Sequence, residues 1–205
     1  MAADNNGWVN FSPAAERNQT PVLAKLQTLL KGNETVLEVG SGSGQHAVHF
    51  CAAMNGLRWI PSDIAELLPG LEINLNPYVS PTICSPELLD LRDNRWHTGF
   101  ATVDVIYSAN TLHIVSWPEV ESLFDGVARL FKPASKLILY GPFRYNGGYT
   151  SSGNAEFDLW LKRRNAESGI RDFEKVNELA EKAGLTLSAD IDMPANNQLL
   201  VWTCK

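Results

Sequence analysis

The sequence contains few cysteines, and their spacing argues against two kinds of site. Among 205 residues there are three, Cys51, Cys84 and Cys204, and no two of them form a CxxC pair. An odd number of distant cysteines suits neither a zinc site nor the disulfide framework of a small secreted domain. Free thiols are typical of proteins in a reducing compartment.

The chain also lacks a surplus of positive charge. Its 17 Lys and Arg residues against 23 Asp and Glu residues give a formal net charge of −6. Proteins that bind nucleic acid or an anionic membrane surface generally rely on clustered positive charge. We therefore expect neither nucleic acid nor a membrane as a partner.

Long hydrophobic runs are absent from the sequence. No segment approaches the roughly 20 apolar residues that a membrane-spanning helix needs. Residues 1–10 carry neither the basic region nor the apolar stretch of a secretory signal. Together with the cysteines, these features predict a cytoplasmic protein.

The sequence does contain an alternation of short strands and helices. A first helix is expected to begin at Thr20, with Pro21 in its first turn, and to end at Gly32. Strands are expected at 35–39, 57–60 (ending near Asp63), 88–91, 103–108, 136–140, 185–191 and 198–204, and further helices at about 45–55, 65–75, 117–131, 155–166 and 172–183. Strands that alternate with helices predict an open, mostly parallel sheet, with helices on both faces and a C-terminal antiparallel hairpin.

The length fits one domain, which we expect to cover 1–205. Within it, 1–32 would form an N-terminal helical segment and 33–205 the core of the sheet. Residues 144–170 contain Tyr145, Tyr149 and a Gly147–Gly148 hinge, which suggest a lid over an acceptor pocket. An ordinary long loop is the alternative.

The run Glu38-x-Gly40-x-Gly42-x-Gly44 carries the most information about function. A strand that leads through a glycine-rich turn into a helix presents bare backbone and helix N–H groups to a ligand. The dinucleotide fingerprint G-x-G-x-x-G requires a third glycine where this chain has Gln45. Glu38 would not favour a pyrophosphate, but it would either face an ammonium group or organise the loop around a zwitterionic ligand.

Two further acidic residues stand at predicted strand ends. Asp63 lies near the end of the second strand, where an acid contacts ribose hydroxyls. Asp90 ends the third strand, where it would accept a hydrogen bond from an adenine amino group. The set describes a nucleoside joined to an amino acid better than a dinucleotide. Pro61 predicts a bulge or a shortened second strand.

This pattern resembles the class I S-adenosylmethionine-dependent methyltransferases. The resemblance implies a Rossmann-like α/β fold with a seven-stranded sheet and an antiparallel last strand, with S-adenosyl-L-methionine as cofactor and S-adenosyl-L-homocysteine as product. It implies that cofactor-binding residues are Glu38, Gly40, Ser41, Gly42, Gly44, Asp63, Ile64, Asp90, Leu91 and Asn110.

A closer resemblance is to domain-of-unknown-function family 938, which is grouped with methyltransferase-like proteins and has no established substrate. The segments that carry it are Phe11–Asn18 with Pro21, Trp59–Ile64, Asn110–Ile114, Tyr140–Phe143 and Gly169–Phe173.

Three other residues are candidates on their own chemistry. His113 follows the fourth strand and would serve as a general base, the alternative being a histidine packed under the sheet edge. His46, in the first turn of its helix, would touch the cofactor's carboxylate. His46 and His49 lack a third ligand, so we expect no metal. Arg17 would clamp a carboxylate, unless it is a solvated surface arginine. Trp160 is expected on the buried face of its helix.

Methyl transfer from a sulfonium depends mainly on positioning. Asn110 is followed by Thr-Leu-His, not by the Pro-Pro-Tyr or Pro-Pro-Phe that the resemblance would require for amino methylation of bases or glutamine. We therefore predict an S-adenosylmethionine-dependent methyltransferase with a small-molecule acceptor. The alternatives are a non-catalytic binding module that acts through a partner, and an NAD(P)-dependent oxidoreductase. The oxidoreductase is disfavoured by Gln45 and by the lack of a Tyr-x-x-x-Lys pair after the fourth strand.

Overall fold

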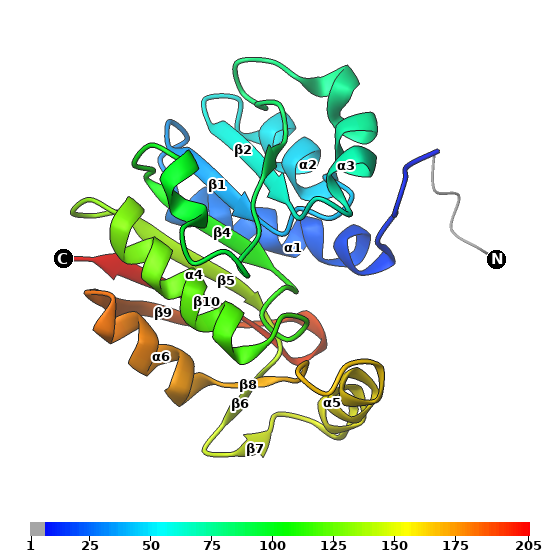
Figure 1. The fold of residues 1–205 in the computed structure, drawn as a ribbon, viewed down its shortest axis with the longest axis vertical. Coiled ribbons are helices and arrows are strands. Elements are labelled where there is room, and N and C mark those ends of the chain that lie inside the picture. Colours follow the sequence, from blue (N-terminus) through cyan, green and yellow to red (C-terminus); the bar gives the residue numbers. More distant parts are fainter. Residues whose placement is uncertain (1–6) are drawn as a thin grey trace. The chain divides into compact units, whose positions relative to one another are not determined.

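The computed structural model describes residues 7–205, and this part of the chain divides into two compact units (Figure 1). The first unit ends at Asp90 and the second spans Leu91–Lys205. Residues 1–6, which belong to the predicted N-terminal segment and to the stretch tested for a secretory signal, lie outside the described residues. The expectation of a single domain over 1–205 stays a prediction.

The first unit is built on three parallel strands in the order β3-β2-β1. They are β1 (Thr35–Val39), β2 (Arg58–Asp63) and β3 (Glu87–Leu88), and the helices are α1 (Pro13–Leu29), α2 (Gln45–Ala53) and α3 (Leu68–Leu75), followed by the 3-10 turn η1 (Asn76–Tyr78). The residues from Val36 to Val39 are all buried. Continuous burial is typical of a parallel strand covered on both faces.

Helix α1 begins at Pro13, so the predicted start at Thr20 was wrong. Ser12 is the N-cap, and its Oγ accepts a hydrogen bond from the Ala15 N–H at 3.2 Å. Pro21 lies inside the helix, where a proline usually costs about 3 kcal/mol because it removes a hydrogen bond. The sequence offers two pairs of a capping residue and a proline, and burial of Val22 and Leu26 after the second pair keeps the longer helix intact.

The bulge predicted from Pro61 is also absent, because Glu38 pairs with Pro61 in an unbroken β1–β2 register. The Trp59 N–H donates to the Thr82 carbonyl, and the Trp59 carbonyl accepts from the Cys84 N–H. Pro61, two residues along, faces the same side. On that side of β2, the pairing with β3 begins only after Pro61, where Ser62 pairs with Glu87. The missing N–H of Pro61 therefore leaves no gap in a ladder.

The third strand is shorter than predicted. It contains only Glu87 and Leu88, and not the residues to 91. Asp90 and Leu91 follow it in a loop, with Leu91 buried and Asp90 half-buried.

The second unit has four further strands in the order β4-β5-β10-β9. They are β4 (Val105–Ala109), β5 (Lys136–Gly141), β9 (Leu185–Met193) and β10 (Asn197–Cys204), with helices α4 (Trp117–Leu130), α5 (Ser152–Arg164) and α6 (Phe173–Lys182) and the 3-10 turns η2 (Trp96–Gly99) and η3 (Pro194–Asn196). Strands β4 and β5 are parallel, whereas β10 is antiparallel to both β5 and β9. The predicted fold class is confirmed: a Rossmann-like α/β fold with a seven-stranded, mostly parallel sheet and antiparallel C-terminal strands.

A small second sheet in this unit was not predicted. It has the order β7-β6-β8, with β6 (Phe143–Tyr145), β7 (Gly148–Tyr149) and β8 (Arg171–Asp172). Strands of two or three residues are too short to show an alternating pattern. The turn between β6 and β7 did have a signal, because Asn146 and Gly147 both have positive φ, at 50° and 73°, as a tight hairpin turn requires.

The prediction that Trp160 lies on the buried face of its helix, α5, was wrong. Its side chain is 45% exposed, and the Arg164 guanidinium lies 4.6 Å from its ring centroid. Among the helices of residues 7–205, none is both long enough and apolar enough to cross a lipid bilayer.

Candidate functional site

The glycine-rich turn joins β1 to α2 in the first unit. Gly40, Gly42 and Gly44 have φ angles of 75°, 58° and 84°. Residues with a Cβ rarely adopt this left-handed region, so the alternate glycines are what allow the turn.

The second and third glycines serve different purposes. A Cβ on Gly44 would lie 2.8 Å from Leu75 Cδ2, so this glycine lets the start of α2 pack closely against α3. A Cβ on Gly42 would meet nothing within 4 Å. The backbone of Gly42 therefore borders open space, as it must where a ligand approaches the turn.

Glu38 lies under the turn and is almost completely buried. Its Oε2 accepts hydrogen bonds from Ser41 Oγ at 2.8 Å and from Trp59 Nε1 at 2.9 Å. Burial raises the pKa of Glu38 to about 7, against the lowering effect of those two hydrogen bonds, and the nearby charge of Asp63 raises it further. The carboxyl group therefore fixes the loop through Ser41. With a pKa of about 7, it is partly protonated at neutral pH.

Asp63 connects the end of β2 to the same turn. Its Oδ2 accepts a hydrogen bond from the Gly42 N–H at 2.7 Å, and its Oδ1 accepts one from the Ile64 N–H at 2.8 Å. Burial raises the pKa of Asp63, while the two backbone hydrogen bonds lower it. Each oxygen accepts one of these bonds, so each keeps acceptor capacity for a ligand hydroxyl.

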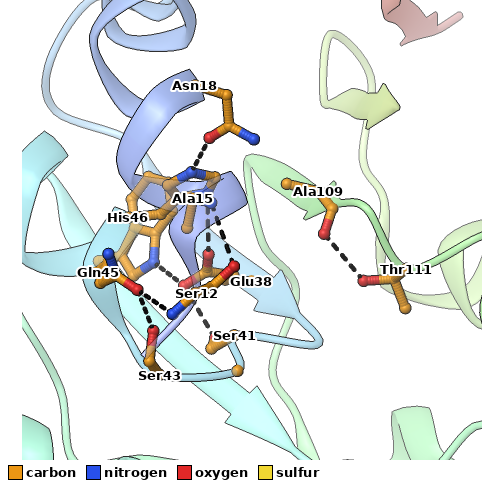
Figure 2. A network of polar contacts seen from close by, with 12 residues as sticks. Ser12, Ala15, Asn18, Glu38, Ser41, Ser43, Gln45, His46, Ala109 and Thr111 are labelled. Atoms are coloured by element: carbon orange, nitrogen blue, oxygen red, sulfur yellow. Dashed lines mark hydrogen bonds and ion pairs between the residues drawn. The ribbon is translucent and has the colours of Figure 1, made fainter. Parts of the chain in front are cut away.

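Gln45, which breaks the dinucleotide fingerprint, attaches α1 to the turn (Figure 2). Its Oε1 accepts hydrogen bonds from the Ser12 N–H at 2.8 Å and from Ser43 Oγ at 2.7 Å. Its Nε2 donates to Glu16 Oε2 at 3.2 Å. Sequence reasoning treated Gln45 only as a missing glycine. The signal available was the set of polar residues between 12 and 18, which had no partner in the sequence-based account.

His46, the next residue, is held in the same way (Figure 2). Its Nε2 lies 2.6 Å from Asn18 Oδ1, its ring stacks on Phe50, and its Nδ1 is 4.0 Å from Glu38 Oε1. Burial lowers the pKa of His46 to about 4, and the proximity of His49 lowers it further. The imidazole is therefore neutral at pH 7, and its contact with Glu38 is not a charged ion pair.

The remaining candidates for cofactor contact are Arg17, Asn110, Asp90 and Leu91. Arg17 is exposed on α1, between the two residues that reach α2. Asn110 follows β4 in a left-handed conformation (φ 58°), which asparagine tolerates better than most residues, and its N–H donates to the Tyr140 carbonyl. Their roles, like those of Asp90 and Leu91, stay predictions.

Metal binding has no support from clustered side chains in the part of the chain that the structure describes. There, no group of three or more His, Cys, Asp or Glu residues could hold an ion.

His113 lies in the loop after β4, in the second unit. It is only 5% exposed, and its ring packs edge-on against Phe157 with the centroids 5.3 Å apart. A Cβ on Gly141 would lie 3.6 Å from its Nδ1. Burial lowers the pKa of His113 to about 4, and the charge of Arg171 lowers it further. His113 is thus a packed histidine whose neutral form at pH 7 can accept a proton.

A family model described as "Protein of unknown function (DUF938)" matches residues 9–204. The chain belongs to this family. In the DUF938 chain, the segment Phe11–Asn18 attaches α1 to the glycine turn through the Ser12 N–H and the side chains of Glu16 and Asn18. The segment Trp59–Ile64 contains Asp63.

The DUF938 chain is also similar to solved methyltransferases. An O-methyltransferase family protein from Burkholderia thailandensis matches with a TM-score of 0.79 and 17% identity over 94% of this chain and 57% of that one. Human N-acetylserotonin methyltransferase, solved in complex with SAM, matches with a TM-score of 0.76 and 14% identity over 93% and 52%. The mitomycin 7-O-methyltransferase MmcR matches with a TM-score of 0.77 and 17% identity over 94% and 54%.

This chain spans little more than half the length of each of these three proteins. At such identities the likeness establishes the fold of the S-adenosylmethionine-dependent methyltransferases.

Proposed function

We propose that this DUF938 protein is an S-adenosylmethionine-dependent methyltransferase that methylates an acidic hydroxyl group of a small molecule. The observation that carries the proposal is the turn between β1 and α2. Three left-handed glycines, open space at Gly42 and two buried carboxyl groups occur together there. Bare backbone next to acidic groups suits a ligand that combines a nucleoside with a positively charged amino-acid part.

The residues of the turn fit this cofactor in a definite way. Gly40, Ser41, Gly42 and Gly44 would form the cradle for the methionyl part, with Glu38 beneath it. Asp63 and Ile64 would bind the ribose, because Asp63 keeps acceptor capacity beyond the two backbone bonds it already receives. Other contacts would come from Asp90 and Leu91 to the adenine, and from Arg17, His46 and Asn110 to the methionyl part.

When bound, S-adenosyl-L-methionine supplies a methyl group on a positively charged sulfur, and S-adenosyl-L-homocysteine is the product. The protein's own contribution is to position the acceptor, to exclude water and to take the acceptor's proton. We assign the last task to His113. Its neutral imidazole would accept the hydroxyl proton as the acceptor oxygen forms its bond to the methyl carbon.

Burial lowers the pKa of His113 to about 4, and from this we infer a preference for acidic acceptors. A base this weak removes a proton efficiently only from a fairly acidic group. A phenolic or enolic hydroxyl therefore suits His113 better than an aliphatic alcohol. The names of two structural neighbours, an O-methyltransferase family protein and a mitomycin 7-O-methyltransferase, agree with oxygen as the methylated atom.

Calorimetric titration tests the cofactor. S-adenosyl-L-methionine and S-adenosyl-L-homocysteine should bind in the micromolar range, NAD(H) should not bind, and Asp63→Ala should weaken binding of both S-adenosyl ligands. Binding of NAD(H) in their place would overturn the proposal.

Transfer of a labelled methyl group to a panel of phenols and aliphatic alcohols tests the reaction. Phenols should be methylated, and His113→Gln should reduce kcat by about 100- to 10,000-fold. His97→Gln, a histidine on η2, is the matched control and should change nothing. Cofactor binding without transfer to any acceptor would favour the non-catalytic binding module.

A further inference from the structure

In the second unit, four consecutive backbone carbonyls after β4 accept hydrogen bonds from one short segment. The acceptors are the carbonyls of 112–115, and the donors all lie within 168–171. The pairs are Arg171 Nε to Leu112 O (2.9 Å), Gly169 N to His113 O (2.9 Å), Ser168 Oγ to Ile114 O (2.5 Å) and Arg171 Nη2 to Val115 O.

Arg171 makes two of these four bonds with one planar group. A guanidinium holds its N–H donors in a fixed fork, so it fixes the separation of the Leu112 and Val115 carbonyls. His113 lies between these two residues in the loop. Its backbone is therefore fixed on both sides by one side chain, and its own carbonyl is bound by Gly169.

The donor segment 168–171 is itself anchored by a fully buried carboxylate. Asp158 Oδ1 accepts a hydrogen bond from the Ile170 N–H at 2.6 Å, and its Oδ2 accepts from Tyr149 Oη and Lys162 Nζ, each at 2.6 Å. A Cβ on Gly169 would lie 3.0 Å from Asp158 Oδ1. The close approach of this segment to α5 therefore favours glycine at 169.

We propose that Arg171 is a positioning residue for His113: by holding the Leu112 and Val115 carbonyls, it fixes the orientation in which the imidazole meets the acceptor. The effect on catalysis rests on the proposed function, whereas the effect on the His113 loop does not. Arg171 acts through the backbone of the loop and need not touch the acceptor.

Arg171 also affects His113 through its charge, and the two effects can be separated. The other groups packed around the ring, Phe157 from α5 and Gly141 from β5, carry no charge. Arg171→Lys keeps the positive charge but replaces the planar fork by a point donor. Arg171→Met removes both the charge and the donors.

The titration of the His113 imidazole, followed by NMR in the protein without ligands, is the first readout. In Arg171→Lys the loop should lose its fixed form, water should reach the ring, and the pKa of His113 should rise toward its ordinary value. Arg171→Met should raise it further, because the lost charge adds to the effect. Arg163→Lys, an exposed arginine on α5, is the matched control and should leave the titration unchanged.

The second readout is the kinetics of methyl transfer. Arg171→Lys should lower kcat by about 100-fold, as expected for a misplaced catalytic group, while the affinity for S-adenosyl-L-methionine stays unchanged. If Arg171→Lys leaves both kcat and the His113 titration at wild-type values, the proposal is overturned, even where the variant is less stable.

Failure of the proposed function gives a different result. If no acceptor is methylated by the wild-type protein, the His113 titration in Arg171→Lys still decides whether this side chain fixes the loop. Should Arg171→Lys not fold, Ser168→Ala removes only one of the four bonds. Both bonds from Arg171 remain in that variant, so the His113 titration should stay close to that of the wild type. A rise of the His113 pKa to its ordinary value would count against the proposal, because the loop would then depend on Ser168 and not on Arg171.

Discussion

His46 in the first unit and His113 in the second are buried to the same extent, and the pKa of each is lowered to about 4. They are held by different means. The ring of His46 is held directly, by Asn18 at its Nε2, by Phe50 under it and by a hydrogen bond with the backbone of Ala15, and a buried carboxyl group lies close by. The loop of His113 is held by its backbone carbonyls, and the charged group that acts on the ring is a cation.

The comparison shows that equal burial of the two histidines does not give the two sites the same dependence of charge on pH. Burial raises the pKa of Glu38, beside His46, to about 7, so we expect the charge of the glycine turn to change near neutral pH. In the His113 loop, residues 112–115, no group has a pKa raised toward neutrality. Burial lowers the pKa of His113 to about 4, so His113 becomes charged only at acidic pH. The predictions below test this contrast, from the largest expected effect to the smallest.

Gly44 in the first unit and Gly184 in the second differ in how closely other residues pack against them. Both have left-handed φ angles, 84° and 82°, but a Cβ would lie 2.8 Å from Leu75 at Gly44 and would meet nothing within 4 Å at Gly184. Gly44→Ala should lower the free energy of unfolding by about 4 kcal/mol, because it adds overpacking to backbone strain. Gly184→Ala should lower it by only about 1 kcal/mol. Urea unfolding measures both, and equal losses would mean that packing at the glycine turn contributes nothing.

Glu38→Gln and His113→Gln should change the pH dependence of stability in opposite directions. The pKa of Glu38 is raised by burial to about 7 in the folded state. Its contribution is therefore fully present below the unfolded value of 4.5 and is lost as the pH rises through 7. The pKa of His113 is lowered by burial from 6.5 to about 4, so its contribution is present above 6.5 and is lost as the pH falls toward 4.

Relative to the wild type, Glu38→Gln should therefore gain stability toward alkaline pH and His113→Gln toward acidic pH, each by an amount on the order of 3 kcal/mol. Urea unfolding at acidic, neutral and alkaline pH gives these differences. Parallel curves for the two variants would refute the contrast.

Asn18→Ala tests the attachment of α1. It leaves His46 Nε2 buried without its partner, which should cost about 2 kcal/mol of stability. The adjacent Gln19→Ala is the control and should change stability by less than about 0.5 kcal/mol. Urea unfolding again provides the measurement. If the two variants behave alike, the Asn18–His46 contact does not stabilise the fold.

Ser168→Ala should have the smallest effect. The Ile114 carbonyl loses its donor, but the other three bonds of the 112–115 loop remain. We expect a loss of about 1 kcal/mol, against no measurable change for the exposed Ser85→Ala. A loss as large as that of Asn18→Ala would mean that the loop depends on each bond separately, and not on Arg171 above all.

Sequence reasoning predicted the features whose cause is local. The glycine turn was found because left-handed backbone requires glycine, and the strands around it were found because the short apolar runs Val36-Leu37 and Trp59-Ile60 lead into polar and turn residues. The fold class followed from their alternation with helices. The N-terminus of α1 was missed because Ser12-Pro13 and Thr20-Pro21 carry the same capping signal. The contacts of Ser12, Glu16 and Asn18 with the start of α2 favour the earlier start, and they join residues far apart in the chain.

The parts that were not predicted depend on residues far apart in the chain. Gln45 is a polar residue like any other until Ser12 and Glu16, about 30 positions earlier, come to meet it. The loop of His113 looks unremarkable until Ser168, Gly169 and Arg171 supply its donors, more than 50 positions later. No periodicity or spacing encodes such pairs, because each forms only when the whole unit folds.

The attachment of α1 has a consequence for protein engineering. The stretch from β1 to α2 cannot be moved to another protein by itself. Gln45 needs Ser12 and Glu16 as partners, and His46 needs Asn18. Grafting this stretch into another Rossmann-like scaffold, or shortening the chain to begin after residue 20, would leave buried polar groups without partners at the glycine turn. A graft that also includes 11–18 would supply the hydrogen-bond partners of both Gln45 and His46.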